Sequence, residues 1–429
     1  MSFIIGPMRK HVNGHKELTS HGDIVKISAP KTIAIPLANG ASDADLLVKE
    51  GDIVKVGTKI AQCNGKFTIP LFSSVSGTVK GVEKRMGAGL KQVDHLLIEN
   101  DDQYTFEAPF APIDFEKATR EELFDFTMNA GIVGCGGAGF PTYVKYKFAV
   151  DVQLLIINAV ECEPYITADY KEMHEHIEDL VVGVKAMVKM AGAPVAKLAI
   201  KATKKDFIPV LNEAFKDAKN IEVVAVPDVY PMGWERTLVY ELTKKRYERL
   251  PIEVGCVVSN ATTAIALGQA LTKGKPIVEK IVTVSGDGIK KPTNVLTPVG
   301  VSAHDIIEQI GGYASEDVLL IAGGPMMGKT INTDAFVITP SSNALTVFIN
   351  KEVREIACLR CGKCSDHCPA GLQPVRINNA AKANNIDALT KLCVNDCIEC
   401  GMCSYICPSK IDVTEGVRRA KRNMALVKK

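Results

Sequence analysis

The hydrophobic pattern is most regular in the middle of the chain. Between residues 120 and 275, short apolar runs alternate with longer stretches in which apolar residues recur at helical spacing. Such alternation is typical of a parallel sheet with helices on both faces, and it predicts an α/β domain. The predicted helices span 120–131, 169–192, 204–218, 235–247 and 261–274, and the predicted strands span 154–160, 196–202, 221–227 and 254–260.

The first hundred residues have a different pattern. Residues 1 to about 30 favour no regular element, whereas short β-rich runs separated by single glycines follow from 46 to 84. These runs resemble the barrel-sandwich hairpin fold of biotinyl and lipoyl domains, and Lys66 has the spacing of their modified lysine. Its neighbours Gly65 and Phe67 differ from the residues that modifying enzymes read, so we expect an unmodified scaffold rather than a swinging arm.

The remaining segments complete a multidomain α/β organisation. After residue 276 come two strands, a turn, a helix opened by Ser302 and further strands, an order that suits a small β-grasp domain. The predicted parts are a barrel-sandwich hybrid domain with its N-terminal segment (1–100), a linker (101–119), a Rossmann-like α/β domain (120–275), a β-grasp domain (276–350) and a C-terminal helical domain (351–429).

In the C-terminal domain, one cysteine spacing occurs twice. Both 358–369 and 397–408 read C-x2-C-x2-C-x3-C-P, the bacterial ferredoxin pattern, in which three thiolates reach one [4Fe–4S] cube and the fourth reaches its sister. We therefore predict cluster one at Cys358, Cys361, Cys364 and Cys407, and cluster two at Cys397, Cys400, Cys403 and Cys368. The segment between the runs, 374–392, is predicted to be a helical spacer.

A pair of zinc sites is the alternative for these cysteines. Zinc prefers two separated ligand pairs, which a compact doubled run fits poorly. The pattern therefore favours two iron–sulfur clusters, and with them the movement of electrons one at a time.

Charge and cysteine usage exclude several classes of protein. The formal net charge is +2, from 51 basic and 49 acidic residues, which argues against a nucleic-acid binder. The cysteines outside the two runs are scattered, unlike a secreted disulfide framework. We find neither a signal peptide nor an apolar run of about 18 residues that would span a membrane. We expect a cytoplasmic protein, either free or peripheral on the cytoplasmic face of the membrane.

A glycine-rich loop, residues 131–141, lies between two predicted helices and ahead of the first predicted strand. Its glycines let the backbone approach a ligand, and consecutive amides can cradle a phosphate. Gly134, Gly136 and Gly139 have the spacing of the dinucleotide fingerprint, but that fingerprint directly follows a strand. A tightly packed turn is therefore the alternative to a phosphate loop.

Two carboxylates follow the first predicted strand. Glu161 and Glu163 lie just after Asn158 and before Tyr165, at the carboxyl end of a buried strand, where open α/β sheets bind ligands. The alternative is a solvated turn, but the flanking polar side chains favour a binding site.

Four segments together resemble a known family. They are GCGGAGFPTYVK (134–145), NAVECEPY (158–165), YPMGWE (230–235) and VVSNATTAIA (257–266). They are similar to the flavin and nucleotide segments of the NADH-oxidising subunits of respiratory complex I and its relatives. The order of modules most closely resembles the C subunit of the Rnf ferredoxin–NAD oxidoreductase complex. The resemblance implies FMN, two [4Fe–4S] clusters and NADH as substrate.

The resemblance also implies roles for individual residues. Around FMN it places Gly134, Gly136, Gly137, Gly139 and Lys145, with Lys145 near the phosphate, and Phe140 at the nicotinamide. It implies that Asn158 and Glu161 hydrogen-bond the flavin and that Glu163, a candidate catalytic residue, faces the nucleotide. Tyr230, Gly233 and Glu235 would line the NADH side, and Asn260 and Thr263 the flavin phosphate.

Three positions depart from the family pattern. Ser259 replaces an asparagine, and Trp234 replaces a smaller or acidic residue beside the expected nicotinamide site, where it could block entry. Cys135 stands where the relatives commonly carry leucine or arginine. We expect this thiol to be partly exposed, with its pKa lowered by nearby amides, and it is a candidate redox thiol. The alternative is a small residue that merely fits the loop.

The sequence leaves three hypotheses for function. The first is an enzyme that passes electrons from NADH through FMN and two clusters to a partner reductase. Cys135 makes the proline reductase-associated Rnf C-like proteins of clostridia the expected nearest relatives, and D-proline reductase the expected acceptor. The second is an iron–sulfur adaptor without its own NADH oxidation, and the third is a peripheral subunit of a membrane Rnf complex.

Overall fold

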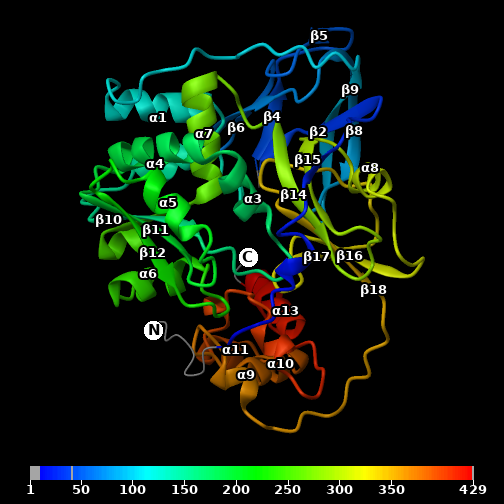
Figure 1. The fold of residues 1–429 in the computed structure, drawn as a ribbon. Helices are drawn as coiled ribbons and strands as arrows, with labels where there is room; N and C mark the ends of the chain where they lie inside the picture. The colour runs from blue at the N-terminus through cyan, green and yellow to red at the C-terminus, as the bar shows by residue number, and fades with distance from the viewer. Residues whose placement is uncertain (1–9, 40–41, 428–429) are drawn as a thin grey trace.

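The protein, seen here as a computed structural model that describes residues 10–39 and 42–427, has four parts (Figure 1). In this view a β-sandwich lies at the top, an α/β domain at the left and a second mixed sheet at the right. The helical cysteine domain lies beneath the other parts. This arrangement brings the C-terminal domain against segments that are distant in the sequence.

Four parallel strands form the sheet of the α/β domain, in the order β12-β11-β10-β13. The predicted parallel sheet is therefore confirmed. Apolar runs without polar alternation form these strands because helices cover both faces. The strands are β10 (Leu154–Ala159), β11 (Val195–Lys201), β12 (Ile221–Val226) and β13 (Cys256–Asn260).

The helices of this domain match the predicted ones with three differences, the smallest being that α6 ends at Thr243 rather than at residue 247. The helix predicted over 169–192 is two helices, because the backbone of His176 leaves helical geometry at φ −130°. Helix α5 is shorter than predicted and begins at Ile208. The helices are α1 (Arg120–Asn129), α2 (Thr142–Lys147), α3 (Ala168–Glu175), α4 (Ile177–Ala191), α5 (Ile208–Ala214), α6 (Glu235–Thr243) and α7 (Ala261–Lys273), with a 3-10 turn η2 (Pro251–Val254).

Two four-stranded antiparallel sheets form the barrel-sandwich part, in the orders β2-β9-β8-β5 and β3-β4-β6-β7. Their apolar residues share one core with the neighbouring mixed sheet, so these two parts are packed as a unit. The strands are β2 (Thr32–Pro36), β3 (Ala38–Asn39), β4 (Ser42–Leu46), β5 (Ile53–Val54), β6 (Lys59–Asn64), β7 (Thr68–Phe72), β8 (Gly77–Met86) and β9 (Gln92–Asn100).

The second sheet has six strands in the order β1-β15-β14-β18-β16-β17. As predicted, Ser302 opens its helix, because the Ser302 side chain accepts a hydrogen bond from the amide of Asp305. The elements are β14 (Glu279–Ser285), β15 (Thr293–Pro298), α8 (Ala303–Gln309), β16 (Val318–Ala322), β17 (Lys329–Ile331) and β18 (Ala344–Ile349).

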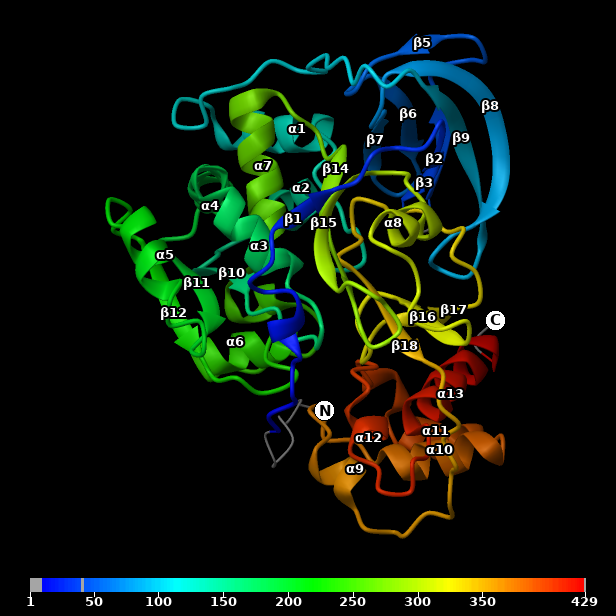
Figure 2. The same cartoon turned by 45° about the vertical axis from the view of Figure 1, so that its right-hand side comes forward.

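The N-terminal segment is more ordered than predicted. A 3-10 turn η1 (Lys16–Leu18) and strand β1 (Ile24–Lys26) interrupt it, and β1 pairs in parallel with β15. The expectation of an irregular segment is therefore wrong for these residues, because the strand is held by a partner 270 residues away rather than by local pattern. Figure 2 shows the segment running upward between the α/β domain and the second sheet.

The C-terminal domain is helical, and its two cysteine loops have matching backbones. The predicted single spacer is two helices, α10 and α11, separated at Ala383–Asn385. Each loop has a glycine with φ 76°, Gly362 or Gly401, before a short helix. The elements are α9 (Lys363–Asp366), α10 (Pro374–Lys382), α11 (Ile386–Lys391), η3 (Val394–Asp396), α12 (Met402–Tyr405) and α13 (Val413–Val427).

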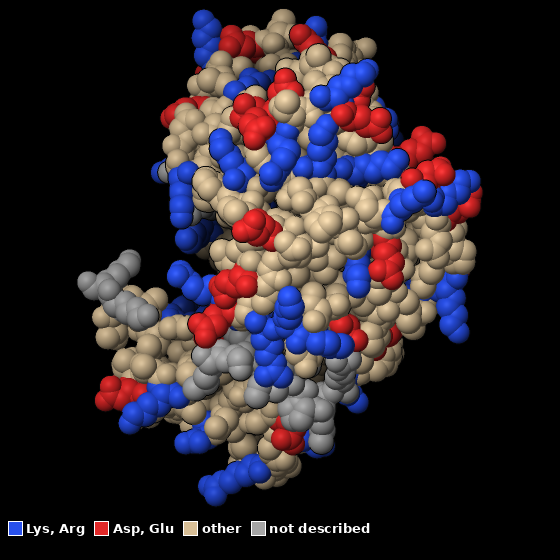
Figure 3. All heavy atoms as spheres, turned by 90° about the vertical axis from the view of Figure 1, so that its left-hand side faces the viewer, with Lys and Arg blue, Asp and Glu red and all other residues tan. Residues whose placement is uncertain are grey.

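The surface charge and the length of the apolar helices are relevant to the kind of partner that the protein binds. Basic and acidic side chains are interspersed over the face that the α/β domain presents to the left of Figure 1, as Figure 3 shows. Within residues 10–39 and 42–427, no helix is both long and apolar enough to cross a bilayer.

Candidate redox site

Two asparagines mark the carboxyl edge of the parallel sheet. Asn158, the last residue but one of β10, lies beside Asn260 of β13, and the two residues are register partners. The Asn260 side chain also caps α7, since its oxygen accepts from the amide of Thr263 at 3.2 Å. A strand edge followed by the N-terminus of a helix is a common place for a ligand in open α/β sheets.

The glycine loop folds onto this edge. The amide of Gly134 donates to the carbonyl of Phe140 at 2.9 Å, and Val133 and Pro141 form an isolated β-bridge. The amide of Cys135 donates to the Thr263 hydroxyl at 3.0 Å, which ties the loop to α7. A Cβ atom at Gly136 would lie 2.9 Å from the Asn260 side-chain nitrogen. This part of the loop is therefore a tightly packed turn, one of the two alternatives that the sequence left open.

The other part of the loop is open. Gly136, Gly137 and Ala138 are exposed, and a Cβ at Gly137 would meet no atom within 4 Å. Phe140 is 39% exposed, and its ring makes an edge contact with Phe67, at 5.4 Å between centroids. An exposed run of small residues above a strand edge and a helix N-terminus fits the planar ring and phosphate of a flavin mononucleotide.

Lys145 and Ser259 make their contacts where α2 meets β13. The Lys145 ammonium donates to the carbonyl of Val258 at 3.0 Å, and burial lowers its pKa, while Glu235 favours its charged form. The hydroxyls of Ser259 and Tyr146 are 2.8 Å apart in the core. This contact explains the departure at Ser259, since that position serves the packing of α2.

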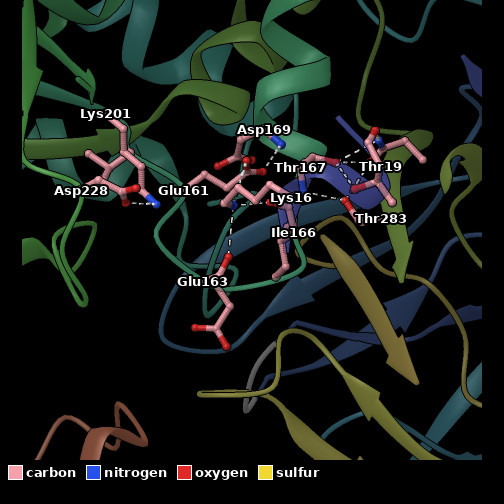
Figure 4. A network of polar contacts seen from close by, with 12 residues as sticks. Lys16, Thr19, Glu161, Glu163, Ile166, Thr167, Asp169, Lys201, Asp228 and Thr283 are labelled. Carbon is pink, nitrogen blue, oxygen red and sulfur yellow. Dashed lines mark hydrogen bonds and ion pairs between the residues drawn. The ribbon is translucent and has the colours of Figure 1, made fainter. Parts of the chain in front are cut away.

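Glu161 is held by a lysine that the sequence did not reveal. Lys16 lies 3.4 Å from the Glu161 carboxylate, donates to the carbonyl of Glu163 at 3.1 Å and also donates to the carbonyl of Ile166 (Figure 4). The amide of Asp169 donates to Glu161 at 2.8 Å. Burial lowers the pKa of Lys16 and raises that of Glu161, and each charge offsets part of the penalty of the other.

No local motif could have identified Lys16, because it lies 145 residues before Glu161 in a segment expected to be irregular. A buried polar network continues from it: Thr19 and Thr167 hydroxyls are 2.7 Å apart, and Thr167 and Thr283 both donate to Asn294. The N-terminal segment, the α/β domain and the second sheet are therefore joined directly beside the strand edge.

Glu163 and Tyr230 lie at a junction with the cysteine domain. The Glu163 carboxylate accepts from the amides of Met326 and Met327 at 2.7 and 3.0 Å, and from the Tyr230 hydroxyl at 3.3 Å. The single proton of this hydroxyl is shared with the carbonyl of Cys400, which is the nearer acceptor at 2.7 Å. Both side chains are engaged in contacts between domains, whereas the resemblance implied that they face the nucleotide.

The rest of the Tyr230–Trp234 loop also lies between the strand edge and the cysteine domain. The side-chain amide of Asn158 donates to the carbonyl of Gly233 at 2.8 Å, so this loop touches the strand edge. Trp234 lines a small cavity together with Tyr247 and Pro369, the residue after Cys368. Glu235 accepts from the Tyr247 hydroxyl at 3.0 Å.

Cys135 differs from its prediction. Its side chain is only 1% exposed, and the thiol faces the carbonyl of Val133 at 3.4 Å. Burial raises the pKa of the thiol, although Lys280 nearby favours the thiolate. The expectation of a partly exposed thiol with a lowered pKa is wrong, because the fold buries the sulfur and burial disfavours the thiolate.

The four cysteines predicted for cluster two surround one small cavity. Cys368, Cys397, Cys400 and Cys403 all line it, although Cys368 comes from the other run. The fourth-cysteine exchange between the runs therefore fits the fold. Within the described chain, no three His, Cys, Asp or Glu side chains converge on a point that would suit a single metal ion.

The cysteines predicted for cluster one are more open. Cys358 and Cys361 are exposed, and Cys364 and Cys407 are partly exposed. The two runs share a feature typical of thiolates that bind iron, an amide directed at the first cysteine: Arg360 to Cys358 at 3.4 Å and Glu399 to Cys397 at 3.3 Å.

Lys66 lies at the tip of the β6–β7 hairpin. This tip reaches the glycine loop, since the Lys66 ammonium lies 5.5 Å from the ring centre of Phe67, which contacts Phe140. The hairpin is also fixed to α2, because the Thr68 amide donates to the Tyr143 hydroxyl at 3.3 Å. Such a fixed tip fits a scaffold better than a swinging arm.

Four known domain families match the chain in sequence order. Residues 10–103 match the RnfC barrel sandwich hybrid domain, 128–269 the Nuo51 FMN-binding domain, 281–330 the SLBB domain and 351–408 the 4Fe-4S dicluster domain. The predicted multidomain architecture, the FMN and the iron–sulfur clusters are confirmed at this level, and zinc is set aside. The exact domain boundaries and the individual site residues stay predictions.

Solved structures share this fold. A NAD+-reducing [NiFe]-hydrogenase in its H2-reduced state aligns over 74% of this chain and 64% of its own, with a TM-score of 0.50 and 19% identity. The air-oxidised state aligns over 72% and 66%, with a TM-score of 0.52 and 18% identity.

Curated relatives match over most of the chain. The C subunit of the Na(+)-translocating ferredoxin:NAD(+) oxidoreductase complex of Acetobacterium woodii is 35% identical over 96% of both chains. Its proton-translocating counterpart from Clostridium ljungdahlii is 34% identical over 85% of this chain and 81% of its own. The C subunit of the ion-translocating oxidoreductase complex of Vibrio cholerae is 33% identical over 90% of this chain, which spans 51% of that longer protein. The chain therefore belongs to the family of C subunits of the ion-translocating Rnf oxidoreductase complexes.

Proposed function

We propose that this protein oxidises NADH at an FMN held on the carboxyl edge of the parallel sheet and passes the electrons singly through two [4Fe–4S] clusters to another subunit of an Rnf-type complex. The observation that carries the proposal is the direct contact between that edge and the cysteine domain, through Asn158, the Tyr230–Trp234 loop and Cys400. Family membership and the FMN-binding and dicluster domain matches support it.

The residues of the glycine loop and of the strand edge have proposed roles in binding the flavin. The exposed backbone of Gly136 and Gly137 would hold the cofactor, while Asn260 and Thr263 keep the loop in place. Bound FMN supplies the chemistry, since a flavin accepts two electrons as a hydride and releases them one at a time. Lys145 adds positive charge beneath the site, and Glu161 is oriented by Lys16. Overall, one NADH becomes one NAD+, one proton and two electrons, and the two electrons would leave one at a time through the clusters.

The adaptor hypothesis depends on a blocked nicotinamide site. The sequence suggested that Trp234 blocks this site. Trp234 lines a cavity with Arg236, Tyr247 and Pro369, among others, and none of the lining residues belongs to the glycine loop. The position of Trp234 thus favours the NADH-oxidising function.

The protein that accepts electrons from the clusters is proposed on other grounds. With Cys135 buried, the observation that pointed to D-proline reductase is weakened. The relatives are named as subunits of ion-translocating complexes, so we propose another Rnf subunit as acceptor, through which the chain is attached to the membrane periphery. Reoxidation of the reduced protein by purified D-proline reductase, at a rate that Cys135→Ala lowers, would favour the other acceptor.

An anaerobic absorbance titration with NADH tests the proposal. The protein is reconstituted with FMN, iron and sulfide, and we expect both the flavin band and the broad cluster absorption to bleach. Dithionite, added afterwards, should cause little further change. If the flavin is bound and dithionite bleaches all bands but NADH bleaches none, the protein is an adaptor and the proposal is wrong.

A further inference from the structure

The two cysteine loops of the C-terminal domain have the same backbone but different surroundings. Arg360 and Glu399 occupy equivalent places with φ 55° and 56°, and Gly362 and Gly401 both have φ 76°. A Cβ at Gly362 would meet only the Asp366 carboxylate, at 3.8 Å. A Cβ at Gly401 would lie 2.5 Å from the carbonyl oxygen of Met326. The second loop is therefore pressed against the body of the protein, and the first is not.

The α/β domain contacts one predicted ligand of cluster two and lies beside the neighbour of another. The Tyr230 hydroxyl binds the carbonyl of Cys400, and Trp234, four residues later, shares a cavity with Pro369, the neighbour of Cys368. Both cysteines belong to the predicted ligand set of cluster two, although they come from different runs. Tyr230 and Cys400 also share a small apolar cluster with Val12 and Met402, against which Cys162 and Met326 pack.

The same loop ends at the proposed flavin site. The Gly233 carbonyl accepts from the side-chain amide of Asn158 at 2.8 Å, and a Cβ at Gly233 would lie 3.1 Å from the sulfur of Cys162. One continuous path of packed and hydrogen-bonded atoms therefore runs from Asn158 through the Tyr230–Trp234 loop to Cys400. Among the described residues, no hydrogen bond from the α/β domain reaches Cys358 or Cys361. Residues 351–363, which include both cysteines, are all exposed.

We propose that the Tyr230–Trp234 loop couples the flavin site to cluster two, which makes cluster two the entry and cluster one the exit for electrons. This inference rests on the proposed function and adds an order to it. Cluster two gains one electron and passes one electron to cluster one, without a proton, so two passages follow each NADH. The Tyr230 hydroxyl is a positioning group that holds the Cys400 loop and stabilises added negative charge there.

The order is tested with two variants of the full-length, reconstituted protein. Cys358→Ser with Cys361→Ser removes only predicted ligands of cluster one, and Cys397→Ser with Cys403→Ser removes only those of cluster two. Each is mixed with NADH, frozen at intervals and followed by electron paramagnetic resonance. We expect the cluster of the first variant to be reduced as fast as in the unchanged protein, and that of the second to stay oxidised over the same time.

Dithionite controls for assembly, because it should reduce the remaining cluster in both variants. Reduction by NADH of the second variant at the rate of the first would overturn the order. The flavin absorbance is recorded in the same samples. If NADH fails to bleach the flavin, the proposed function fails, whereas a bleached flavin with the wrong cluster reduced contradicts only this inference.

A measurement without NADH tests the role of Tyr230. In an equilibrium redox titration, Tyr230→Phe should shift the cluster potential downward in the variant that keeps cluster two, since a hydrogen-bond donor near the cluster is lost. No shift is expected in the variant that keeps cluster one. Tyr313→Phe is the matched control, because that hydroxyl binds Asp334 in the second sheet at 3.0 Å. Equal shifts in both backgrounds, or none, would contradict the proposal.

Discussion

At the scale of the residue, Gly136 shows why a glycine is needed in the loop. The φ angle of Gly136 is one that any residue adopts, so conformational freedom does not explain the glycine. The glycine is needed because there is no room for a side chain. A methyl group would meet the Asn260 side chain, which cannot easily move because it caps α7 and donates to Asp169 at 2.7 Å. The close approach of the loop to the strand edge thus depends on a missing Cβ.

We predict that Gly136→Ala lowers flavin retention and stability together. Forced overpacking costs about 1–3 kcal/mol, and here the cost falls on the loop that we expect to hold FMN. The flavin-to-protein ratio after gel filtration and the midpoint of thermal unfolding measure the two effects. Gly89→Ala is the control, since a Cβ there meets no atom within 4 Å. Full flavin content in Gly136→Ala would contradict the packing argument.

At the scale of the element, the helices that cover one face of the parallel sheet are joined by glycines. A Cβ at Gly183 of α4 would lie 1.8 Å from the carbonyl oxygen of Ala264 in α7, and one at Gly268 of α7 would lie 2.0 Å from that of Asp179. The two backbones therefore touch at two reciprocal points. Since α7 begins at the Asn260 cap, this contact fixes the helix N-terminus beneath the glycine loop.

Gly268→Ala should separate the two helices. Alanine is the better helix former by about 1 kcal/mol, but the backbone clash costs more, so we expect a net loss of about 1–3 kcal/mol in the free energy of unfolding. Chemical denaturation followed by circular dichroism measures the change. A stability gain instead would mean that helix propensity outweighs the packing at this point.

The elements themselves were largely readable from the sequence. The apolar runs of β10–β13 and the serine at the start of α8 were predicted because each is encoded by neighbouring residues. The break at His176 was not, because apolar periodicity continues through it. Likewise, the spacing of the eight cysteines is enough to predict two ligand sets, whereas the hydrogen bond from the Cys135 amide to Thr263 joins residues 128 positions apart. Contacts distant in sequence leave no periodic signal.

At the scale of the whole molecule, the N-terminal segment joins parts that the sequence presented as separate. It adds β1 to the second sheet, bridges to Tyr230 at Lys10 and carries Lys16 to the strand edge. The sequence predicted the modules and their order, but not these contacts. The proposed path between flavin site and clusters depends on such contacts, since it requires the modules to be fixed relative to one another.

The ion pair between Lys16 and Glu161 can be used to test whether the N-terminal segment holds these parts together. The two side chains are only 14% and 8% exposed, so Lys16→Met should leave a buried carboxylate unpaired, at a cost of about 3–5 kcal/mol. Adding Glu161→Gln removes that charge while an acceptor for the Asp169 amide remains. The double variant should therefore lose less stability than the two single losses added together, by about 0.5–3 kcal/mol.

Thermal unfolding of the four proteins of this cycle measures the coupling, and limited proteolysis reports whether residues 10–23 become accessible. The exposed pair Lys31 and Glu99, at 3.6 Å, is the control, and Lys31→Met should change neither result. Additive losses with unchanged proteolysis would mean that the segment is held by β1 alone. Coupled losses with faster cleavage would show that the carboxylate expected to meet the flavin also holds the N-terminal segment in place, so that closure of the molecule and preparation of its redox site depend on the same contact.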